Sequence, residues 1–171
     1  MRLAALLVAS LLDAAAPHLR PDAAELRSIV ADARERSATF RQLVERIERS
    51  DVIVYVRSQH FASSQLDGRI GFVRGSNPAG AARILLVELA CPRSLAVQAA
   101  TLAHELHHAS EIAEAPWVRD TATLAEYYRR VGEEATALGG GAAFETAGAR
   151  ATAQRVRLEL SGALKLAHES R

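Results

Sequence analysis

Two amphipathic helices are predicted at the start of the chain, because apolar positions recur there at intervals of three and four residues. The first helix opens at Pro21, and Asp22 and Glu25 in its first turn interact favourably with the positive end of the helix dipole. Residues 37–39 interrupt the pattern, and the second helix ends near Ser50. The positions expected to pack are Leu26, Ile29, Val30, Ala33, Phe40, Leu43, Val44 and Ile47.

Three strands are predicted next, in segments enriched in β-branched and other apolar residues. They cover residues 51–57, 68–74 and 82–89, and residues 75–80 form a turn rich in Gly, Pro and Asn. The first of the three is largely apolar, which indicates a mostly buried strand. The third is a candidate edge strand that would align an extended peptide by adding it to the sheet.

Helical patterns return after the third strand. Ser94 is the expected N-cap of a helix that ends near Pro116. Asp120 or Thr121 begins a shorter helix, which Gly132 closes. Its apolar side consists of Leu124, Tyr127, Tyr128 and Val131.

The last predicted element is a helix over residues 143–168, which follows a flexible joint at the triple glycine 139–141. Its expected packing positions are Phe144, Ala147, Val156, Leu160 and Leu164. Helices, a small three-strand sheet and further helices follow one another along the chain, so the predicted fold class is α+β.

The overall composition is that of an ordinary globular domain. The chain has 171 residues, of which 49% are hydrophobic and 24% charged, with a net charge of +1. This length suits a single domain, here residues 17–171. Basic residues are spread out and mixed with acidic ones, which argues against nucleic acid as a partner. The single cysteine, Cys91, cannot form an internal disulfide and is expected to be a small buried residue at a strand end.

Residues 1–16 have the layout of a secretory signal peptide. Arg2 gives a positive start, residues 3–12 form an apolar run, and residues 14–16 are alanines suited to cleavage. The sequence therefore predicts export, to the periplasm or out of the cell, with no membrane span once this segment is removed. The alternative is a buried first helix in a cytoplasmic protein.

Residues 104–108 read His-Glu-Leu-His-His, an HExxH motif within the helix that follows Ser94. A helix turns about 100° per residue, so His104 and His108 project from one face about one turn apart. Two imidazoles in this arrangement can bind one zinc ion. Glu105 then lies beside the metal, where its carboxylate can accept a proton from water.

The alternative interpretation of the motif is a solvated polar face with ordinary contacts between successive helical turns. Apolar residues argue against it, because Leu95, Leu102, Leu106 and Ile112 line one side and alanines occupy much of the rest. The imidazoles and the carboxylate are therefore expected to be partly buried, and partly buried polar groups need partners.

A catalytic zinc site requires a third protein ligand. The metzincin pattern is absent, because its glycine and third histidine positions hold Glu111 and Glu114. A glutamate from a later helix is the better source, and Glu145, just after the triple glycine, is preferred. Glu126 and Glu111 remain as alternatives, with Glu111 also suited to hydrogen-bonding a histidine. Two less favoured acids flank a helix end, Glu133 and Glu134.

Residues 103–109, followed by Phe-Glu-Thr-Ala-Gly-Ala at 144–149, resemble the zincin metallopeptidases with His-His-Glu ligands. Residues 39–120 further resemble small exported bacterial proteins that carry a HELxHA pattern. The resemblance implies a zinc-dependent hydrolase of peptide bonds that acts on a peptide or protein substrate. It also implies that His104 and His108 are metal ligands and that Glu105 is the general base.

Hydrolysis would also need a hydrogen-bond donor for the oxyanion that forms on the scissile carbonyl. Tyr127, Tyr128 and His107 are the candidate sources, and core packing with a surface hydroxyl is the favoured role for the tyrosines. A different class of function also fits the motif. It is a non-catalytic zincin-like module that binds a metal for stability or binds a partner.

Overall fold

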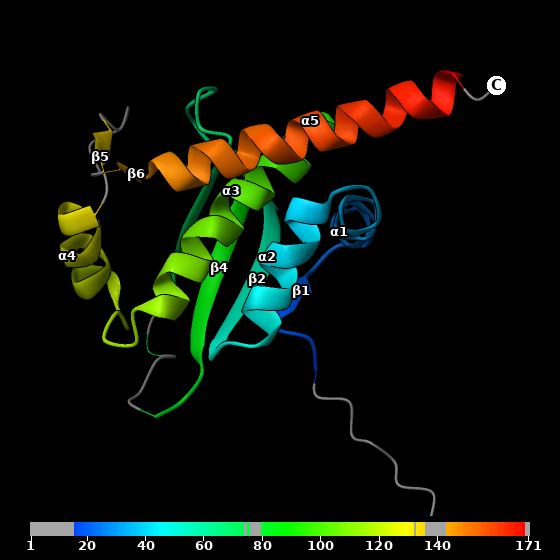
Figure 1. The fold of residues 1–171 in the computed structure, drawn as a ribbon. Coiled ribbons are helices and arrows are strands. Elements are labelled where there is room, and N and C mark those ends of the chain that lie inside the picture. Colours follow the sequence, from blue (N-terminus) through cyan, green and yellow to red (C-terminus); the bar gives the residue numbers. More distant parts are fainter. Residues whose placement is uncertain (1–15, 74, 76–79, 132, 136–142, 170–171) are drawn as a thin grey trace, which may run out of the picture.

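The computed structural model describes residues 16–73, 75, 80–131, 133–135 and 143–169, and Figure 1 shows their arrangement. The fold class is α+β, as the sequence predicts. In chain order the described elements are β1 (Leu19–Pro21), α1 (Ala24–Arg36), α2 (Ala38–Glu48), β2 (Val52–Gln59), β3 (Gly68–Phe72), β4 (Arg83–Ala90), α3 (Leu95–Glu114), α4 (Thr121–Val131), β5 (Glu133–Ala135), β6 (Ala143–Glu145) and α5 (Ala147–Glu169).

Strand β4 lies inside the larger sheet, whose order is β1-β2-β4-β3. It pairs with β2 in parallel, from Val52 opposite Arg83 to Gln59 opposite Ala90, and with β3 in antiparallel fashion. The sequence-based prediction that residues 82–89 form an edge strand is therefore wrong. Among the described strands, β3 is the edge that faces the helix carrying the HExxH motif.

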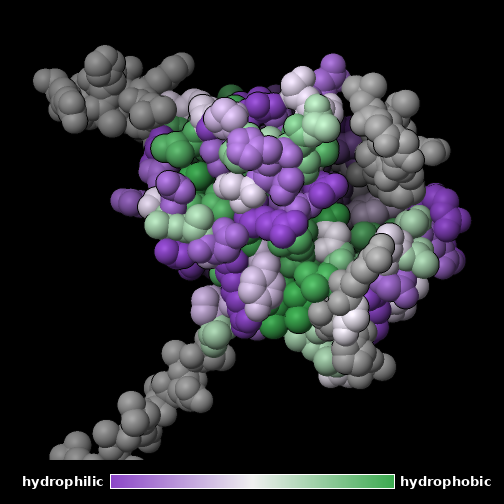
Figure 2. Space-filling view, turned by 180° about the vertical axis from the view of Figure 1, so that it is seen from behind, coloured by the Kyte–Doolittle hydropathy of each residue, from purple (hydrophilic) through white to green (hydrophobic). Residues whose placement is uncertain are grey.

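Helices α1, α2 and α3 cover one face of the sheet, and α5 crosses α3 on the outer side (Figure 1). Alternate strand residues point to this helical face and are fully buried, as Val54, Leu85 and Val87 are. Residues of the opposite parity, such as Tyr55 and Leu86, lie on the other face and are more exposed. Figure 2 shows that apolar side chains gather among polar ones on this second face.

The buried Arg83 connects the start of β4 to the C-terminal end of α3. Its guanidinium donates hydrogen bonds to the carbonyls of Ile112, Ala115 and Val118 at 2.6, 2.9 and 3.1 Å. It also forms a two-pronged ion pair with Asp51, at 2.6 and 3.0 Å. Because the last carbonyls of a helix have no partner within the helix, Arg83 fixes where α3 ends against the sheet.

The sequence correctly predicts the order of the longer elements, and Ser94 is confirmed as the N-cap of α3, accepting a hydrogen bond from Val97 N at 3.4 Å. The strand count is wrong. The larger sheet has four strands rather than three, and β5 and β6 form a separate two-stranded sheet. β1 has no alternating pattern of its own, because it is only three residues long and ends at Pro21. The first helix accordingly begins at Ala24 rather than at Pro21.

The last helix begins at Ala147 and not at residue 143, so Glu145 belongs to β6 instead of opening α5. Val156 and Leu160 are confirmed as packing positions, whereas Ala147 is exposed. The side chains of two further predicted positions, Phe144 and Leu164, are not among those described.

Several sequence predictions fall outside the described residues. They concern the signal peptide, of which only Ala16 is described, the closing Gly132 and the glycine joint at 139–141. Within the described part of the chain, no helix is both long enough and apolar enough to cross a membrane.

The Arg83 contacts lead to a stability prediction. Arg83→Met should lower the free energy of unfolding by at least about 3 kcal/mol, because it leaves Asp51 and four backbone carbonyls at and just beyond the end of α3 without their charged donor. Urea unfolding followed by circular dichroism measures this change. Arg49→Met is the control, since Arg49 is exposed and its ion pair is with the exposed Glu45, and it should cost less than about 0.5 kcal/mol. Equal losses in the two variants would contradict the role given to Arg83.

Candidate metal centre

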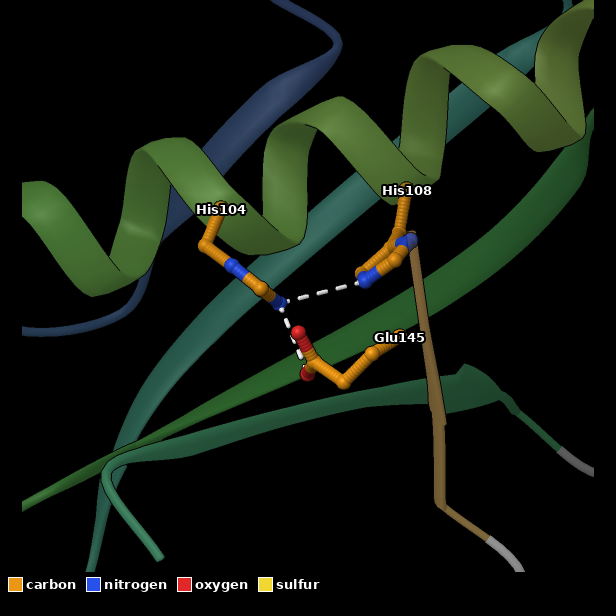
Figure 3. Close-up of side chains that lie close together, drawn as sticks. All are labelled: His104, His108 and Glu145. Atoms are coloured by element: carbon orange, nitrogen blue, oxygen red, sulfur yellow. Dashed lines mark hydrogen bonds and ion pairs between the residues drawn. The ribbon is translucent and has the colours of Figure 1, made fainter. Parts of the chain in front are cut away.

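His104 and His108 bring their Nε2 atoms together on one side of α3, 3.2 Å apart. Their rings meet edge to face, with centroids separated by 4.8 Å. Glu145 reaches the same point from β6, and its Oε1 lies 3.2 Å from His104 Nε2 (Figure 3). The ligand atoms of all three residues lie within 4.8 Å of one another. The structure thus brings together the three side chains that the sequence selects as metal ligands.

Thr146 fixes Glu145 at the junction between β6 and α5. Its hydroxyl accepts a hydrogen bond from Ala149 N at 3.1 Å, as an N-cap of α5 does, and donates to Glu111 Oε1 at 2.8 Å. Sequence analysis misses Thr146 because it places the helix start at residue 143. A threonine three residues before Ala149 is nevertheless a recognisable N-cap signal.

Charges within the group favour a deprotonated Glu145 beside a readily protonated His104. The hydrogen bond from His104 lowers the pKa of Glu145 more than burial raises it. Burial lowers the pKa of His104, but the hydrogen bond to Glu145 and the charges of Glu105, Glu145 and Glu111 raise it overall. A cation at this point would be stabilised by the same carboxylates, in competition with the proton on His104.

Glu105 is 6% exposed and lies beneath the first residue of β3. A Cβ atom on Gly68 would stand 3.1 Å from Glu105 Oε1 and 2.5 Å from Thr101 Cγ2, so only glycine lets β3 approach α3 this closely. Burial raises the pKa of Glu105, although positive charge on His108 and His104 opposes the rise. Gly68 is missed by sequence analysis, because no strand pattern reveals which helix a glycine will face.

Glu111 contacts His108 at Nδ1, the ring nitrogen that does not face His104. Its Oε2 is 2.8 Å from His108 Nδ1, and its Oε1 is 3.4 Å from His107 Nε2. The hydroxyl of Tyr128 donates to Oε2 at 3.3 Å. Burial opposes the negative charge on Glu111, but the hydrogen bonds from His107, His108 and Thr146 hold its pKa far below the usual range. Glu111 therefore contacts a histidine rather than joining the group that could hold a metal ion.

Tyr127, Tyr128 and His107, the candidate donors for an oxyanion, each contact other side chains in this structure. The Tyr128 hydroxyl lies 2.9 Å from His108 Nδ1, on the opposite side of the ring from Nε2. His107 Nδ1 lies 3.0 Å from the Thr152 hydroxyl, which ties α3 to α5. The Tyr127 ring packs between those of Trp117 and Tyr128, with centroids at 6.1 and 5.2 Å.

The remaining acidic alternatives do not join the group. Glu126 is on α4 and pairs with Arg130, one turn further along the same helix. Glu133 and Glu134 belong to β5, and their side chains are not among those described. Cys91 is partly exposed rather than buried, and its sulfur lies 3.5 Å from His60 Nε2.

Two of the three distances within the group suit a small tetrahedral cation, and the ligand atoms of His108 and Glu145 lie within 4.8 Å of each other. Zinc binds imidazole nitrogen and carboxylate oxygen at about 2.0–2.2 Å, which places two ligand atoms of a tetrahedron about 3.3–3.5 Å apart. The Nε2–Nε2 and Nε2–Oε1 separations are both 3.2 Å. Two imidazoles and one carboxylate are also a donor set that zinc accepts. The residues present therefore fit a zinc ion.

Comparison of the chain with protein-family models, with curated proteins and with solved structures finds no match. The side chains of the site are therefore the basis for inferring what the protein does. His108 and Glu105 are 3% and 6% exposed, so the motif does not form a solvated face. Both need partners inside the protein.

The position of Glu145 yields a test of the ligand set. Glu145→Gln should weaken zinc binding on the order of 100-fold or more. Loss of a residue that hydrogen-bonds to a metal ligand typically weakens binding about 10–100-fold, and loss of the ligand itself should cost at least as much. Glu126→Gln is the matched control and should bind zinc like the parent. Competition with a coloured chelator measures both affinities. The reverse order of effects would show that Glu126, and not Glu145, is the third ligand.

Proposed function

We propose that the protein is a zincin-type, zinc-dependent metallopeptidase that hydrolyses peptide bonds in a peptide or protein substrate. The observation that carries this proposal is the buried carboxylate of Glu105, which shares α3 with His104 and His108 and interacts electrostatically with Glu145. A structural zinc site is closed by four protein ligands and has no use for such a group. A hydrolytic site needs a proton acceptor next to its open position.

Zinc held by His104, His108 and Glu145 would supply Lewis acidity, which brings the pKa of water toward ~7 and polarises a carbonyl group. The role of Glu105 is to accept the proton of the attacking water at a carboxylate oxygen and to return it to the leaving amine. A carboxyl whose pKa is raised by burial is better matched to both tasks, because proton transfer is most efficient when the pKa of the catalytic group lies near the working pH.

The edge of β3 offers a place for an extended substrate. The Asp67 carbonyl and the Val73 amide both hydrogen-bond to β4, at 2.8 and 3.0 Å. Because hydrogen-bonded positions alternate along an antiparallel strand, the backbone groups of Gly68, Ile70 and Phe72 point toward the outer edge. Within the described part of the chain no strand pairs with that edge. A substrate strand added there would pass close to Glu105, which lies beneath Gly68.

The proposal includes export to the periplasm or the medium, and it rests on the signal-like pattern of residues 1–16. A lone cysteine is compatible with either compartment, because this fold needs no disulfide. Zinc is the proposed cofactor, and the proposed partner is a peptide or protein rather than nucleic acid.

A second function is a non-catalytic module that binds a metal for stability or binds a partner. The observation that favours it is that the side chains of Tyr128 and His107 hydrogen-bond to His108 and Thr152, so neither is a free donor for an oxyanion in this structure. Among the described side chains, this leaves Glu105 as the group that distinguishes the two functions.

Replacing Glu105 separates catalysis from metal binding. Glu105→Gln should retain zinc at the parental stoichiometry and should lower the rate of peptide hydrolysis about 10²–10⁴-fold, the usual contribution of a general base. Cleavage of a peptide library followed by mass spectrometry provides the rate, and Glu114→Gln on the exposed end of α3 is the control. Undiminished hydrolysis by Glu105→Gln would remove Glu105 from the mechanism. A zinc-loaded parent without hydrolysis would favour the binding module.

A further inference from the structure

The side chain of Glu111 contacts residues of two helices, α3 and α4, and Thr146 at the junction between β6 and α5. Its carboxylate accepts hydrogen bonds from Thr146 at 2.8 Å and from Tyr128 at 3.3 Å, and it lies 2.8 Å from His108 Nδ1 and 3.4 Å from His107 Nε2. Its side chain is only 17% exposed. A carboxylate can accept about four hydrogen bonds, so these partners occupy its full capacity.

The contact with His108 determines which nitrogen of that ring is free to bind a metal. An ionised carboxylate only accepts hydrogen bonds, so Nδ1 of a neutral His108 must carry the proton that faces Glu111. Nε2 then has its lone pair directed toward His104 Nε2, 3.2 Å away. Glu111 thereby selects the tautomer in which His108 can act as a ligand, and it also fixes the plane of the ring.

The contact between Glu111 and Thr146 also positions the third ligand, Glu145. Thr146 is the next residue after Glu145, and its hydroxyl bonds to Glu111 Oε1 and to Ala149 N. The approach of this segment to α3 is close, since a Cβ on Gly148 would stand 2.5 Å from His107 Nε2. The hydrogen bond between Thr146 and Glu111 therefore connects the strand end that carries Glu145 to the helix that carries the histidines.

We infer that Glu111 is a positioning residue that assembles the metal site, holding His108 directly and Glu145 through Thr146. This inference rests on the proposed function in one respect, namely that the group binds a metal. The HExxH motif supplies two of the metal ligands, and Glu145 supplies the third. Glu111 sets their mutual distance, because two of the three ligands depend on its two oxygen atoms. Tyr128 brings α4 into the same assembly through its bonds to His108 and Glu111.

A purely structural role for Glu111 would have different consequences. If Glu111 served only to hold α3 and α5 together, its loss would lower the stability of the metal-free protein and leave the coordination of a bound metal unchanged. If it positions the ligands, its loss changes the affinity and the coordination spectrum of the metal. The visible absorption of cobalt(II) is suitable here, because it responds to the number and arrangement of ligands.

The experiment compares Glu111→Gln, Thr146→Val, Thr146→Ser and the parent. Zinc affinity is measured by chelator competition, cobalt(II) spectra report coordination, and thermal melting of the metal-free proteins reports folding. Glu111→Gln and Thr146→Val should bind zinc about 10–100-fold more weakly and give altered cobalt(II) spectra. Thr146→Ser keeps the hydroxyl and should restore both readouts. Glu114→Gln is the matched control, because Glu114 is an exposed acid on the same helix.

The outcomes separate this inference from the proposal on which it rests. Parental zinc affinity and cobalt(II) spectrum in Glu111→Gln and Thr146→Val would overturn the positioning role, while leaving the metal site in place. A parent that binds neither zinc nor cobalt(II) would instead overturn the metal site itself. If Glu111→Gln does not fold, the comparison of Thr146→Val with Thr146→Ser decides the question, since equal binding by the two would contradict the inference.

Discussion

The burial of helix α3 between the sheet and α5 is the constraint on which the rest of the structure depends. Its apolar side is fully buried at Leu102, Leu106 and Ala109, and burial of each leucine contributes about 1.5–3 kcal/mol. The same packing removes Glu105 and His108 from water. Polar groups so placed must be paired, and every buried polar side-chain atom in the described part of the chain has a partner. The site is thus a consequence of packing this helix on both sides.

Three carboxylates lie around His104 and His108 of α3, and their surroundings give them different properties. Glu111 and Glu145 have lowered pKa values because they accept hydrogen bonds from histidines, which favours their charged forms. Glu105 has a raised pKa because burial dominates its environment. Two charged carboxylates suit ligation and positioning, whereas a carboxyl that exchanges its proton more easily suits acid–base chemistry. The same residue type is therefore suited to three different roles at one site.

The sequence predicts those parts of the molecule that depend on local patterns. His104 and His108 converge because they share one helix, and the longer helices and strands each bury a continuous apolar side. Where Glu145 lies depends instead on how β6 and α5 fold back over α3. The position after the triple glycine selects a residue that does lie beside His104, but the prediction assigns it to the wrong element. No local sequence pattern predicts strand β1, because its three residues form a strand by pairing with β2. The same holds for the close approach at Gly68, which depends on the position of α3.

We propose that His104, His108 and Glu145 together hold one metal ion. Elemental analysis of protein purified without a histidine tag, incubated with zinc and freed of excess metal, tests it most directly when the parent is compared with His104→Ala. The account predicts one zinc per chain in the parent and none in the variant. No zinc in the parent, or equal zinc in both proteins, would contradict it and reduce the HExxH motif to a hydrogen-bonded cluster on a buried helix.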